Sequence, residues 1–384
     1  MMKVPLLDLA AQYATMRREI RDAMDRVCES QHFILGPEVD ALEKEIAAYC
    51  SAGFAIGVSS GTDALLAALM AAGVGPGDEV ITSTYSFFAT AGVIARLQAR
   101  PVFVDIDAAT FNLDAKQVDA ALSARTKAII PVHLFGQSAN MDAVMDLARK
   151  HNLAVIEDGA QSLGAKCGGR FVGGIGTFGT YSFFPSKNLG ALGDAGMLVA
   201  NDDALAEKAR LLRTHGSKPK YYHKLVGANF RLDSIQAAFL RVKLPHYNSY
   251  TEKRTANAAF YTEKLSKLPG VILASDSQSA PDAKMILPVA QPNCDHIWNQ
   301  YTLRLPGAGR RDALKKHLTD RGIGTEIYYP VPMHEQECFA YCNAMNSCPA
   351  ASRLAQEVIS IPIYPELAPA QRDEVVAELA VFLK

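Results

Sequence analysis

Short apolar segments alternate with amphipathic stretches over about the first two thirds of the chain, and this alternation predicts an α/β fold. Most of the apolar segments are nearly continuous in Val, Ile and Phe, which is typical of a mainly parallel sheet buried on both faces. The predicted strands are Phe54–Val58, Glu79–Ser83, Pro101–Ile106, Lys127–Val132, Leu153–Glu157, Gly179–Phe184 and Gly196–Ala200. The predicted helices include Asp63–Ala72, Ala89–Leu97, Met141–Lys150 and one that begins at Pro37.

A second, smaller domain is predicted by a change of pattern near Asp233. The chain has 384 residues, more than one hydrophobic core usually organises. A helix that starts at Ser234 meets Pro245, and a proline inside a helix usually kinks or ends it. We therefore predict a large domain over residues 1–245 and a smaller α+β domain over residues 246–384, with a connecting helix between them. In this division the N-terminal segment is free to pack on the smaller domain.

Charge and cysteine content exclude several classes of protein. Lys and Arg number 39 against 40 Asp and Glu, so the net charge of −1 gives no overall field that attracts nucleic acid or an anionic membrane. No apolar run approaches the ~20 residues of a membrane-spanning helix. The seven cysteines contain no C-x-x-C pair and no zinc-like spacing, which favours free thiols in a reducing cytoplasm and no metal site. We expect a soluble, cytoplasmic enzyme.

Residues 174–179, Gly-Ile-Gly-Thr-Phe-Gly, match the G-x-G-x-x-G pattern of dinucleotide sites. That pattern requires a strand before it and a helix after it, because the pyrophosphate binds at the helix N-terminus. Here the motif follows a polar, glycine-rich segment and leads into the predicted strand Gly179–Phe184. We interpret the motif as a turn between strands. This interpretation removes the strongest sequence evidence for a nicotinamide-dependent dehydrogenase.

Three other places carry groups that suit a site. The segment Val58–Ala64 joins a strand to a helix through small residues, and such a helix start binds anions, although a plain N-cap explains it equally well. Asp158 follows an apolar strand, where open α/β sheets place their ligands, or it simply caps the next turn. Lys187 is the only charged residue between Arg170 and Asp194, so its amine is poorly solvated and nucleophilic unless it reaches out to solvent.

Together, these three segments indicate which cofactor the protein could bind. Pyridoxal phosphate needs an anion site for its phosphate, a carboxylate for its pyridinium nitrogen and an amine for its aldehyde. The segment Val58–Ala64, Asp158 and Lys187 supply these groups in that order along the chain. The residues therefore predict an enzyme that uses pyridoxal phosphate.

The chain resembles the sugar aminotransferases of the DegT/DnrJ/EryC1/StrS family, which have the aspartate-aminotransferase fold (fold type I). The resemblance covers nearly the whole chain and implies a large domain with a mainly parallel, seven-stranded sheet flanked by helices. The segments that carry it are Gly36–Glu38, Ser60–Ala64, Glu157–Gln161, Ser182–Gly190, Asn229–Asp233 and Tyr328–His334.

The resemblance also implies roles for individual residues. Lys187 would hold the cofactor covalently and move the substrate proton, and Asp158 would pair with the pyridinium nitrogen. Other implied cofactor contacts are Gln161 near the ring hydroxyl, Phe87 stacked on the ring, Gly61, Thr62 and Ser182 at the phosphate, and Asn229 at the phosphate of the neighbouring subunit of a homodimer. Arg231, Tyr329 and His334 are the candidate substrate contacts, for which solvated loop residues are an equally good interpretation. Phe88 is the alternative to Phe87, and an exposed loop is the alternative to a nucleotide-diphosphate contact at Lys218–Lys224.

The reaction implied by the resemblance is transfer of the amino group of L-glutamate to a keto sugar attached to a nucleotide. The segment Tyr328–His334 is most similar to enzymes that act at C3, for instance on a UDP-linked 3-keto-N-acetylglucosaminuronate for a surface polysaccharide. Amination at C4 and a dTDP-linked 3-keto-6-deoxyhexose are the alternatives. A cofactor-dependent sugar dehydratase of the same fold is disfavoured because those relatives lack the lysine that Lys187 supplies. A regulatory relative would be expected to lose Asp158, Ser182 or Lys187.

Overall fold

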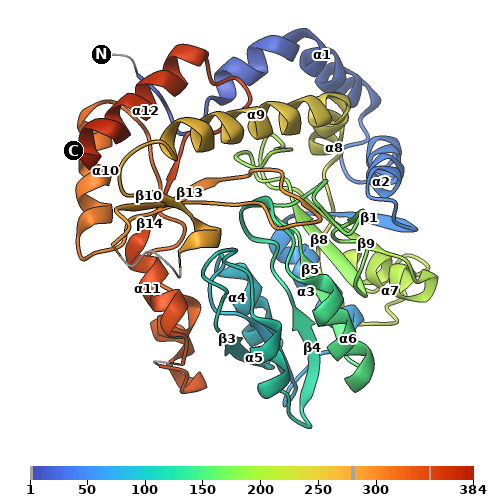
Figure 1. The fold of residues 1–384 in the computed structure, drawn as a ribbon. Coiled ribbons are helices and arrows are strands. Elements are labelled where there is room, and N and C mark those ends of the chain that lie inside the picture. The colour runs from blue at the N-terminus through green and yellow to red at the C-terminus, as the bar shows by residue number, and fades with distance from the viewer. Residues whose placement is uncertain (1–2, 278–281, 346) are drawn as a thin grey trace.

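A seven-stranded sheet forms the centre of the protein (Figure 1). The structure is a computed structural model that describes residues 3–277, 282–345 and 347–384. The strand order is β1–β9–β8–β5–β4–β2–β3. Strand β9 is antiparallel to both of its neighbours, and the other adjacent pairs are parallel. The strands are β1 (Phe54–Val58), β2 (Glu79–Ser83), β3 (Arg100–Val104), β4 (Thr126–Ile130), β5 (Ala154–Asp158), β8 (Phe178–Ser182) and β9 (Gly196–Ala200).

This sheet confirms the predicted fold class. Each of the seven predicted strands matches an observed strand to within two residues at either end. Two of these ends matter for the site. Asp158 is the last residue of β5 rather than the first residue after it, and β8 ends at Ser182, so Phe183 and Phe184 lie outside the strand.

Helices cover both faces of the large sheet, because alternate residues of its strands point to opposite sides. In β9, Leu198 belongs to one hydrophobic core, whereas Met197 and Val199 belong to another. Helix α3 is apolar almost all round and is buried beside the sheet, as expected for a helix enclosed on several sides. The helices of this part are α1 (Leu9–Ser30), α2 (Pro37–Tyr49), α3 (Gly61–Ala71), α4 (Ala89–Arg96), α5 (Ala115–Ala120), η1 (Leu134–Gly136), α6 (Met141–His151), α7 (Asp203–Arg213) and α8 (Ser234–Lys243).

The glycine motif at residues 174–179 forms a turn that leads into β8, as predicted, and the anion at this turn is the protein's own Glu157. One carboxylate oxygen of Glu157 accepts from the N–H groups of Ile175 (2.8 Å) and Gly176 (2.6 Å). The other oxygen accepts from the N–H of Gly173 (2.7 Å) and from Nε2 of His133 (2.9 Å). The amides that a pyrophosphate would need are therefore already occupied.

A smaller sheet has four strands in the order β10–β11–β13–β14. The N-terminal segment joins this part, since the N–H of Val4 donates to the carbonyl oxygen of Gly322 (3.0 Å) and Val4 is buried in the core of the smaller sheet. Its strands are β10 (Val271–Leu273), β11 (Met285–Leu287), β13 (Tyr301–Arg304) and β14 (Val358–Ile361). Its helices are η3 (Ala274–Asp276), α10 (Arg310–Asp320), η4 (Met333–Glu335), η5 (Glu337–Cys342), α11 (Pro349–Glu357) and α12 (Pro369–Leu383).

Helix α9 (Tyr247–Leu265) connects the two parts and runs along one side of the molecule from α8 towards α12 (Figure 1). Tyr247 near its start packs with the helices of the large sheet, whereas Tyr261 near its end packs in the core of the smaller sheet. Pro245 lies in the 3-10 turn η2 (Leu244–His246) between α8 and α9. The predicted domain boundary between residues 245 and 246 falls at this turn and stays a prediction.

A third, short sheet has the strand order β12–β6–β7 and joins segments that are far apart in the sequence. Its strands are β6 (Lys166–Cys167), β7 (Arg170–Phe171) and β12 (Cys294–Asp295). Within the three described ranges, no helix has the length and apolarity to cross a lipid bilayer.

Candidate active site

Asp158 ends β5, and its carboxylate is buried and held by two donors. The hydroxyl of Thr90 in α4 donates to Oδ2 at 2.7 Å, and the N–H of Ala160 donates to Oδ1 at 3.1 Å. This is the carboxyl end of the parallel strands, where sheets of this kind present their ligand-binding groups. Burying a carboxylate costs free energy unless a cation or further hydrogen-bond donors stabilise its charge, so a nearby positive charge would stabilise Asp158.

The amine of Lys187 lies close enough to Asp158 for their charges to interact. Lys187 follows β8 in a loop and lines a small pocket together with Gln161, Ser182 and Asn188. Burial lowers the pKa of the Lys187 amine to about 8, and the negative charge of Asp158 partly opposes this shift. A pKa of 8 leaves ~10% of the amine neutral at pH 7, against below ~0.1% at the ordinary lysine value. The structure therefore places an amine of lowered pKa within charge–charge range of a carboxylate, and the catalytic roles of Lys187 and Asp158 stay predictions.

The residues of the predicted phosphate site lie where β1 leads into α3, and their contact with a phosphate stays a prediction. Gly196 begins β9 and pairs with Val58 of β1 on one side and with Ser182 of β8 on the other. This pairing brings Ser182 against Gly61, where a Cβ atom on Gly61 would lie 2.7 Å from the Cβ of Ser182. Ser60 Oγ accepts from the N–H of Asp63 at 3.0 Å, so the N–H groups at the very start of α3 point towards the same corner.

We expect Gly196→Ala to weaken binding of pyridoxal phosphate about 10-fold or more, because overpacking typically costs ~1–3 kcal/mol. A Cβ at this position would lie 2.3 Å from the carbonyl carbon of Ser60 and 2.7 Å from the nitrogen of Gly61, and backbone atoms cannot move aside as a side chain can. Titration of the cofactor-free protein measures the dissociation constant. Gly193→Ala is the matched control, because its Cβ would meet only the end of the Gln236 side chain at 3.3 Å. Equal affinity in the two variants would contradict the prediction.

Gln161 and Tyr329 lie together beside Asp158. Gln161 Nε2 donates to the hydroxyl of Tyr329 at 3.3 Å, and its Oε1 accepts from the N–H of Phe135 at 2.7 Å. Burial and the charge of Asp158 raise the pKa of Tyr329, so its hydroxyl keeps its proton and remains a donor. The structure thus brings together a predicted cofactor contact and a predicted substrate contact, whose roles stay predictions.

The structure separates the two phenylalanines that compete for the stacking role. Phe88 packs its ring on Phe339 with centroids 5.5 Å apart, and a Cβ on Gly92 would lie 2.9 Å from it. Phe87 is 58% exposed, and its ring lies near Tyr329 with centroids 6.3 Å apart. Phe88 is also 48% exposed, but because its ring packs on Phe339 the geometry favours Phe87 as the stacking side chain, and this role stays a prediction.

Arg231 lies next to the predicted phosphate corner. It forms an isolated antiparallel bridge with Val58, the last residue of β1. Its Nε is buried and has no hydrogen-bond partner among the described residues, which leaves it able to donate to an anion. Asn229 is exposed in the same segment, where it bridges Thr214, and its contact with a neighbouring subunit stays a prediction.

His334 is the predicted substrate contact that the structure places least favourably. Its imidazole is buried, with Nδ1 2.6 Å from the hydroxyl of Thr84 and Nε2 3.5 Å from a carboxylate oxygen of Glu335. Burial lowers the pKa of His334, so it is mostly neutral at pH 7. A substrate contact would require this side chain to leave its partners. The geometry favours a role in holding the segment that carries Tyr329, and the direct contact stays a prediction.

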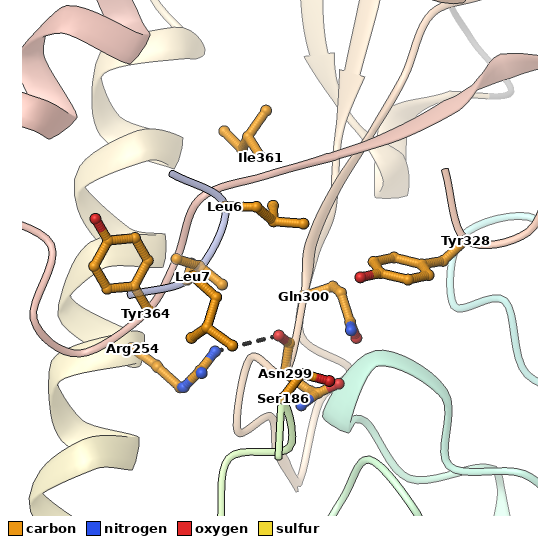
Figure 2. A pocket seen from close by; sticks show the side chains of 10 residues that line it. Leu6, Leu7, Ser186, Arg254, Asn299, Gln300, Tyr328, Ile361 and Tyr364 are labelled. Atoms are coloured by element: carbon orange, nitrogen blue, oxygen red, sulfur yellow. Dashed lines mark hydrogen bonds between the residues drawn. The ribbon is translucent and has the colours of Figure 1, made fainter. Parts of the chain in front are cut away.

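Beside Ser186 lies a hollow lined by residues from distant parts of the chain (Figure 2). The guanidinium of Arg254, from α9, donates through Nη1 to the carbonyl oxygen of Asn299 at 3.2 Å. Asn299 Nδ2 in turn donates to Oδ1 of Asn188 at 2.8 Å. Arg254 therefore positions one wall of the site against the residue that follows Lys187.

The match to a family covers nearly the whole chain. The model described as the DegT/DnrJ/EryC1/StrS aminotransferase family matches residues 14–380. The chain belongs to this family. The predicted family is therefore confirmed, and the protein is an aminotransferase.

Named relatives align with this chain over nearly its whole length. The "Pleiotropic regulatory protein" of Geobacillus stearothermophilus is 50% identical over 384 residues, which is 100% of this chain and 99% of the relative. The "UDP-N-acetyl-3-dehydro-alpha-D-glucosamine 3-aminotranferase" of Acidithiobacillus ferrooxidans is 43% identical over 99% of this chain and 97% of its own length. The solved structure of DesV from S. venezuelae has a TM-score of 0.93 and 40% identity, and covers 100% of this chain and 99% of its own.

The site residues of this DegT/DnrJ/EryC1/StrS aminotransferase fit the cofactor predicted from the sequence. NtdA of Bacillus subtilis, solved with "bound cofactor pmp", has a TM-score of 0.90 and 28% identity, and covers 100% of this chain and 86% of its own. Three groups of this chain lie around one corner of the large sheet. They are the Lys187 amine, whose pKa is lowered, the Asp158 carboxylate, which is hydrogen-bonded to Thr90, and the start of helix α3 at Gly61. Dependence on pyridoxal phosphate, which is a property of the family, is thus confirmed.

Sequence reasoning missed the residues that hold the site rather than form it. Thr90 donates a hydrogen bond to the Asp158 carboxylate. The hydrogen bond between Asn299 and Asn188 joins the segment after β12 to the loop of Lys187. The available signal for Thr90 was its place in the Tyr-Ser-Phe-Phe-Ala-Thr segment that supplied Phe87. Nothing in the local pattern links any of these residues to its partner, because each partner is distant in sequence.

Proposed function

We propose that this aminotransferase moves the amino group of L-glutamate to the C3 ketone of a sugar attached to a nucleotide, with a UDP-linked 3-keto-N-acetylglucosaminuronate as the first candidate. The observation that carries the proposal is the Lys187 amine, which is desolvated and lies within charge–charge range of the buried Asp158 carboxylate. A lysine of this kind is able to form a covalent bond with an aldehyde and to transfer a proton.

Lys187 is the residue that moves the proton in this proposal. When bound, pyridoxal phosphate supplies an aldehyde for covalent attachment and a ring that accepts the electrons of the broken Cα–H bond. The amine of Lys187 then removes the proton from Cα of glutamate and holds it at Nζ. In the second half of the reaction, Lys187 returns a proton to the carbon that becomes the amino-bearing carbon of the sugar.

Asp158 and its neighbours hold the reacting groups in place. The Asp158 carboxylate would keep a proton on the ring nitrogen of the cofactor, and the Thr90 hydroxyl fixes the direction in which that carboxylate points. Gly61, Thr62 and Ser182 would bind the phosphate, with Arg231 close to this corner. Gln161 donates to the hydroxyl of Tyr329 and would hold that hydroxyl near the ring of the bound cofactor.

The position of amination and the nucleotide are supported by similarity and by one exposed loop. The relative from Acidithiobacillus ferrooxidans is named for a 3-aminotransferase acting on a UDP-linked sugar. The segment Lys218–Lys224 carries three lysines with the exposed rings of Tyr221 and Tyr222, which suits stacking on a base and pairing with a diphosphate. Amination at C4 and dTDP-linked sugars remain the competing substrates.

We place the enzyme in the cytoplasm as a homodimer that shares its active sites. The seven cysteines are free thiols, which suits a reducing compartment. The exposed Asn229 is available for a second subunit. Solution scattering or sedimentation at micromolar concentration measures the oligomeric state, and a monomer that retains full activity would contradict the shared site.

Two other functions are weighed against this one. A sugar dehydratase of the same fold lacks the lysine, whereas Lys187 is present and partly desolvated. A purely regulatory protein has the name of the relative from Geobacillus stearothermophilus in its favour. Against it stands the retention of Asp158, Ser182 and Lys187 in one corner of the sheet, which regulation alone does not require.

The test is a reverse assay with 2-oxoglutarate and a panel of UDP- and dTDP-linked amino sugars that carry the amine at C3 or C4. We expect formation of glutamate, with the highest kcat/KM for a UDP-linked 3-amino sugar. A higher kcat/KM for a 4-amino sugar or for a dTDP-linked sugar would replace the proposed substrate. No glutamate from any member of the panel, with cofactor bound, would favour the regulatory alternative.

A further inference from the structure

Cys167 and Cys294 are directly opposite each other in the short sheet that joins the two parts of the chain. They are paired in the antiparallel ladder between β6 and β12, although they lie 127 positions apart in sequence (294 − 167). Opposite residues of such a ladder point to the same face of the sheet. Both are free thiols in this structure.

The ladder places this pair at a position that suits a disulfide bond. One residue beyond it, the N–H of Gly168 donates to the carbonyl oxygen of Asn293 at 2.9 Å. Hydrogen-bonded and non-hydrogen-bonded pairs alternate in an antiparallel ladder, so Cys167 and Cys294 form a non-hydrogen-bonded pair, whose Cα atoms are typically about 4.5 Å apart. Disulfides join Cα atoms about 4.4–6.8 Å apart.

The two thiols differ in access to solvent. Cys167 is buried, whereas Cys294 is half-buried and lines a wide, open groove beside α9. Burial raises the pKa of the Cys294 thiol to about 12, and the neighbouring Cys167 adds to this shift. At neutral pH the reactive thiolate is therefore scarce, so oxidation should be slow and should become faster as the pH rises.

We propose that Cys167 and Cys294 are a site of reversible disulfide formation, with a small disulfide such as oxidised glutathione as the oxidant. The Cys294 thiolate attacks one sulfur of oxidised glutathione and releases one glutathione thiolate. The Cys167 thiolate then attacks the sulfur of Cys294 and releases the second. The two cysteines are oxidised, the glutathione disulfide is reduced, and the two protons lost by the cysteines appear on the two glutathione molecules.

The bond would connect β6 to the segment that leads into the active site. After β12, the N–H of Ile297 donates to the carbonyl oxygen of Gly136 at 2.9 Å, and Asn299 Nδ2 donates to Asn188 at 2.8 Å. A covalent link between Cys294 and Cys167 therefore anchors this segment to β6 of the short sheet. Because the link closes a loop of over one hundred residues, the oxidised protein should unfold about 5 °C higher than the reduced protein.

The experiment incubates the reduced full-length protein with oxidised glutathione at pH 7 and pH 9, blocks free thiols, and digests it with trypsin. Cleavage after Lys166, Arg170, Lys284 and Arg304 isolates Cys167 in residues 167–170 and Cys294 in residues 285–304. We expect these two peptides to be joined, with a loss of about 2 Da for the whole chain and a rate about 10-fold higher for each pH unit. Dithiothreitol should reverse both the link and the shift in melting temperature.

Three variants distinguish the pair from general oxidation. Cys294→Ser should lose the link, and Cys167→Ser should instead hold glutathione on Cys294. Cys28→Ser, at an exposed position in α1, should keep the link and the melting shift. A lasting glutathione adduct on wild-type Cys294, a disulfide between other cysteines, or no change in melting temperature on oxidation would overturn the proposal. The inference does not depend on the proposed function, since its readouts are mass and stability.

Discussion

Replacing Lys187 with alanine is expected to lower the rate of transamination by at least about 10⁴-fold, the upper range of a positioned acid–base group. The variant loses the amine that takes the proton from the donor and the only attachment point proposed for the cofactor. Its fold should be retained, because Lys187 lies in a loop after β8 and not in a hydrophobic core. Steady-state assays with glutamate measure the loss of activity.

Covalent labelling shows whether this lysine in particular carries the cofactor. Reduction of the wild-type enzyme with borohydride in the presence of pyridoxal phosphate should give a stable adduct on Lys187 and none in Lys187→Ala. Lys243→Met is the matched control, because burial also lowers the pKa of Lys243 to about 8, but its Nζ donates to the carbonyl oxygen of Gly190 at 2.7 Å. The adduct should survive in this control. Labelling of Lys243, or an unlabelled wild type, would refute the assignment.

Replacing Asp158 with asparagine is expected to lower kcat about 10²–10³-fold, the usual effect of removing one electrostatic group at a reacting centre. The amide keeps the shape of the side chain but cannot keep a proton on the ring nitrogen through a negative charge. The same change should alter the pH dependence of labelling. Since Asp158 raises the pKa of Lys187, its loss should move the midpoint for attachment of the cofactor to lower pH than about 8.

Thr90→Val separates the charge of Asp158 from its orientation. Valine has nearly the shape of threonine but cannot donate to Oδ2, so one hydrogen bond of 2.7 Å is lost while the charge remains. We expect about a 10-fold loss of kcat, the value of roughly one hydrogen bond, with the pH midpoint of attachment unchanged. A shift of the midpoint in Thr90→Val equal to that in Asp158→Asn would show that the charge of Asp158 is not the cause.

Local sequence was sufficient to predict the architecture of the large sheet. Strand β9, with the sequence Gly-Met-Leu-Val-Ala, is buried along its whole length, and a continuous apolar segment of this kind identifies a strand without knowledge of its neighbours. The chemical groups at the strand ends follow from the same pattern, because the carboxyl ends of parallel strands meet at one edge. The end of β5 at Asp158 and the loop of Lys187 after β8 therefore lie at the same edge of the sheet, although the sequence pattern alone left the roles of these two residues open.

The sequence by itself determined the fold class and the cofactor chemistry, and it predicted Asp158 and Lys187 as the two central residues of the site. Only the tertiary structure showed that Phe88 packs on Phe339 while the more exposed Phe87 lies near Tyr329, and that His334 is enclosed by Thr84 and Glu335. It also paired Cys167 with Cys294. The physical reason is the separation of the residues along the sequence. Periodicity and apolar runs indicate whether a residue's own segment is buried. The contacts named above mostly join side chains that are far apart along the chain and meet only in the folded protein.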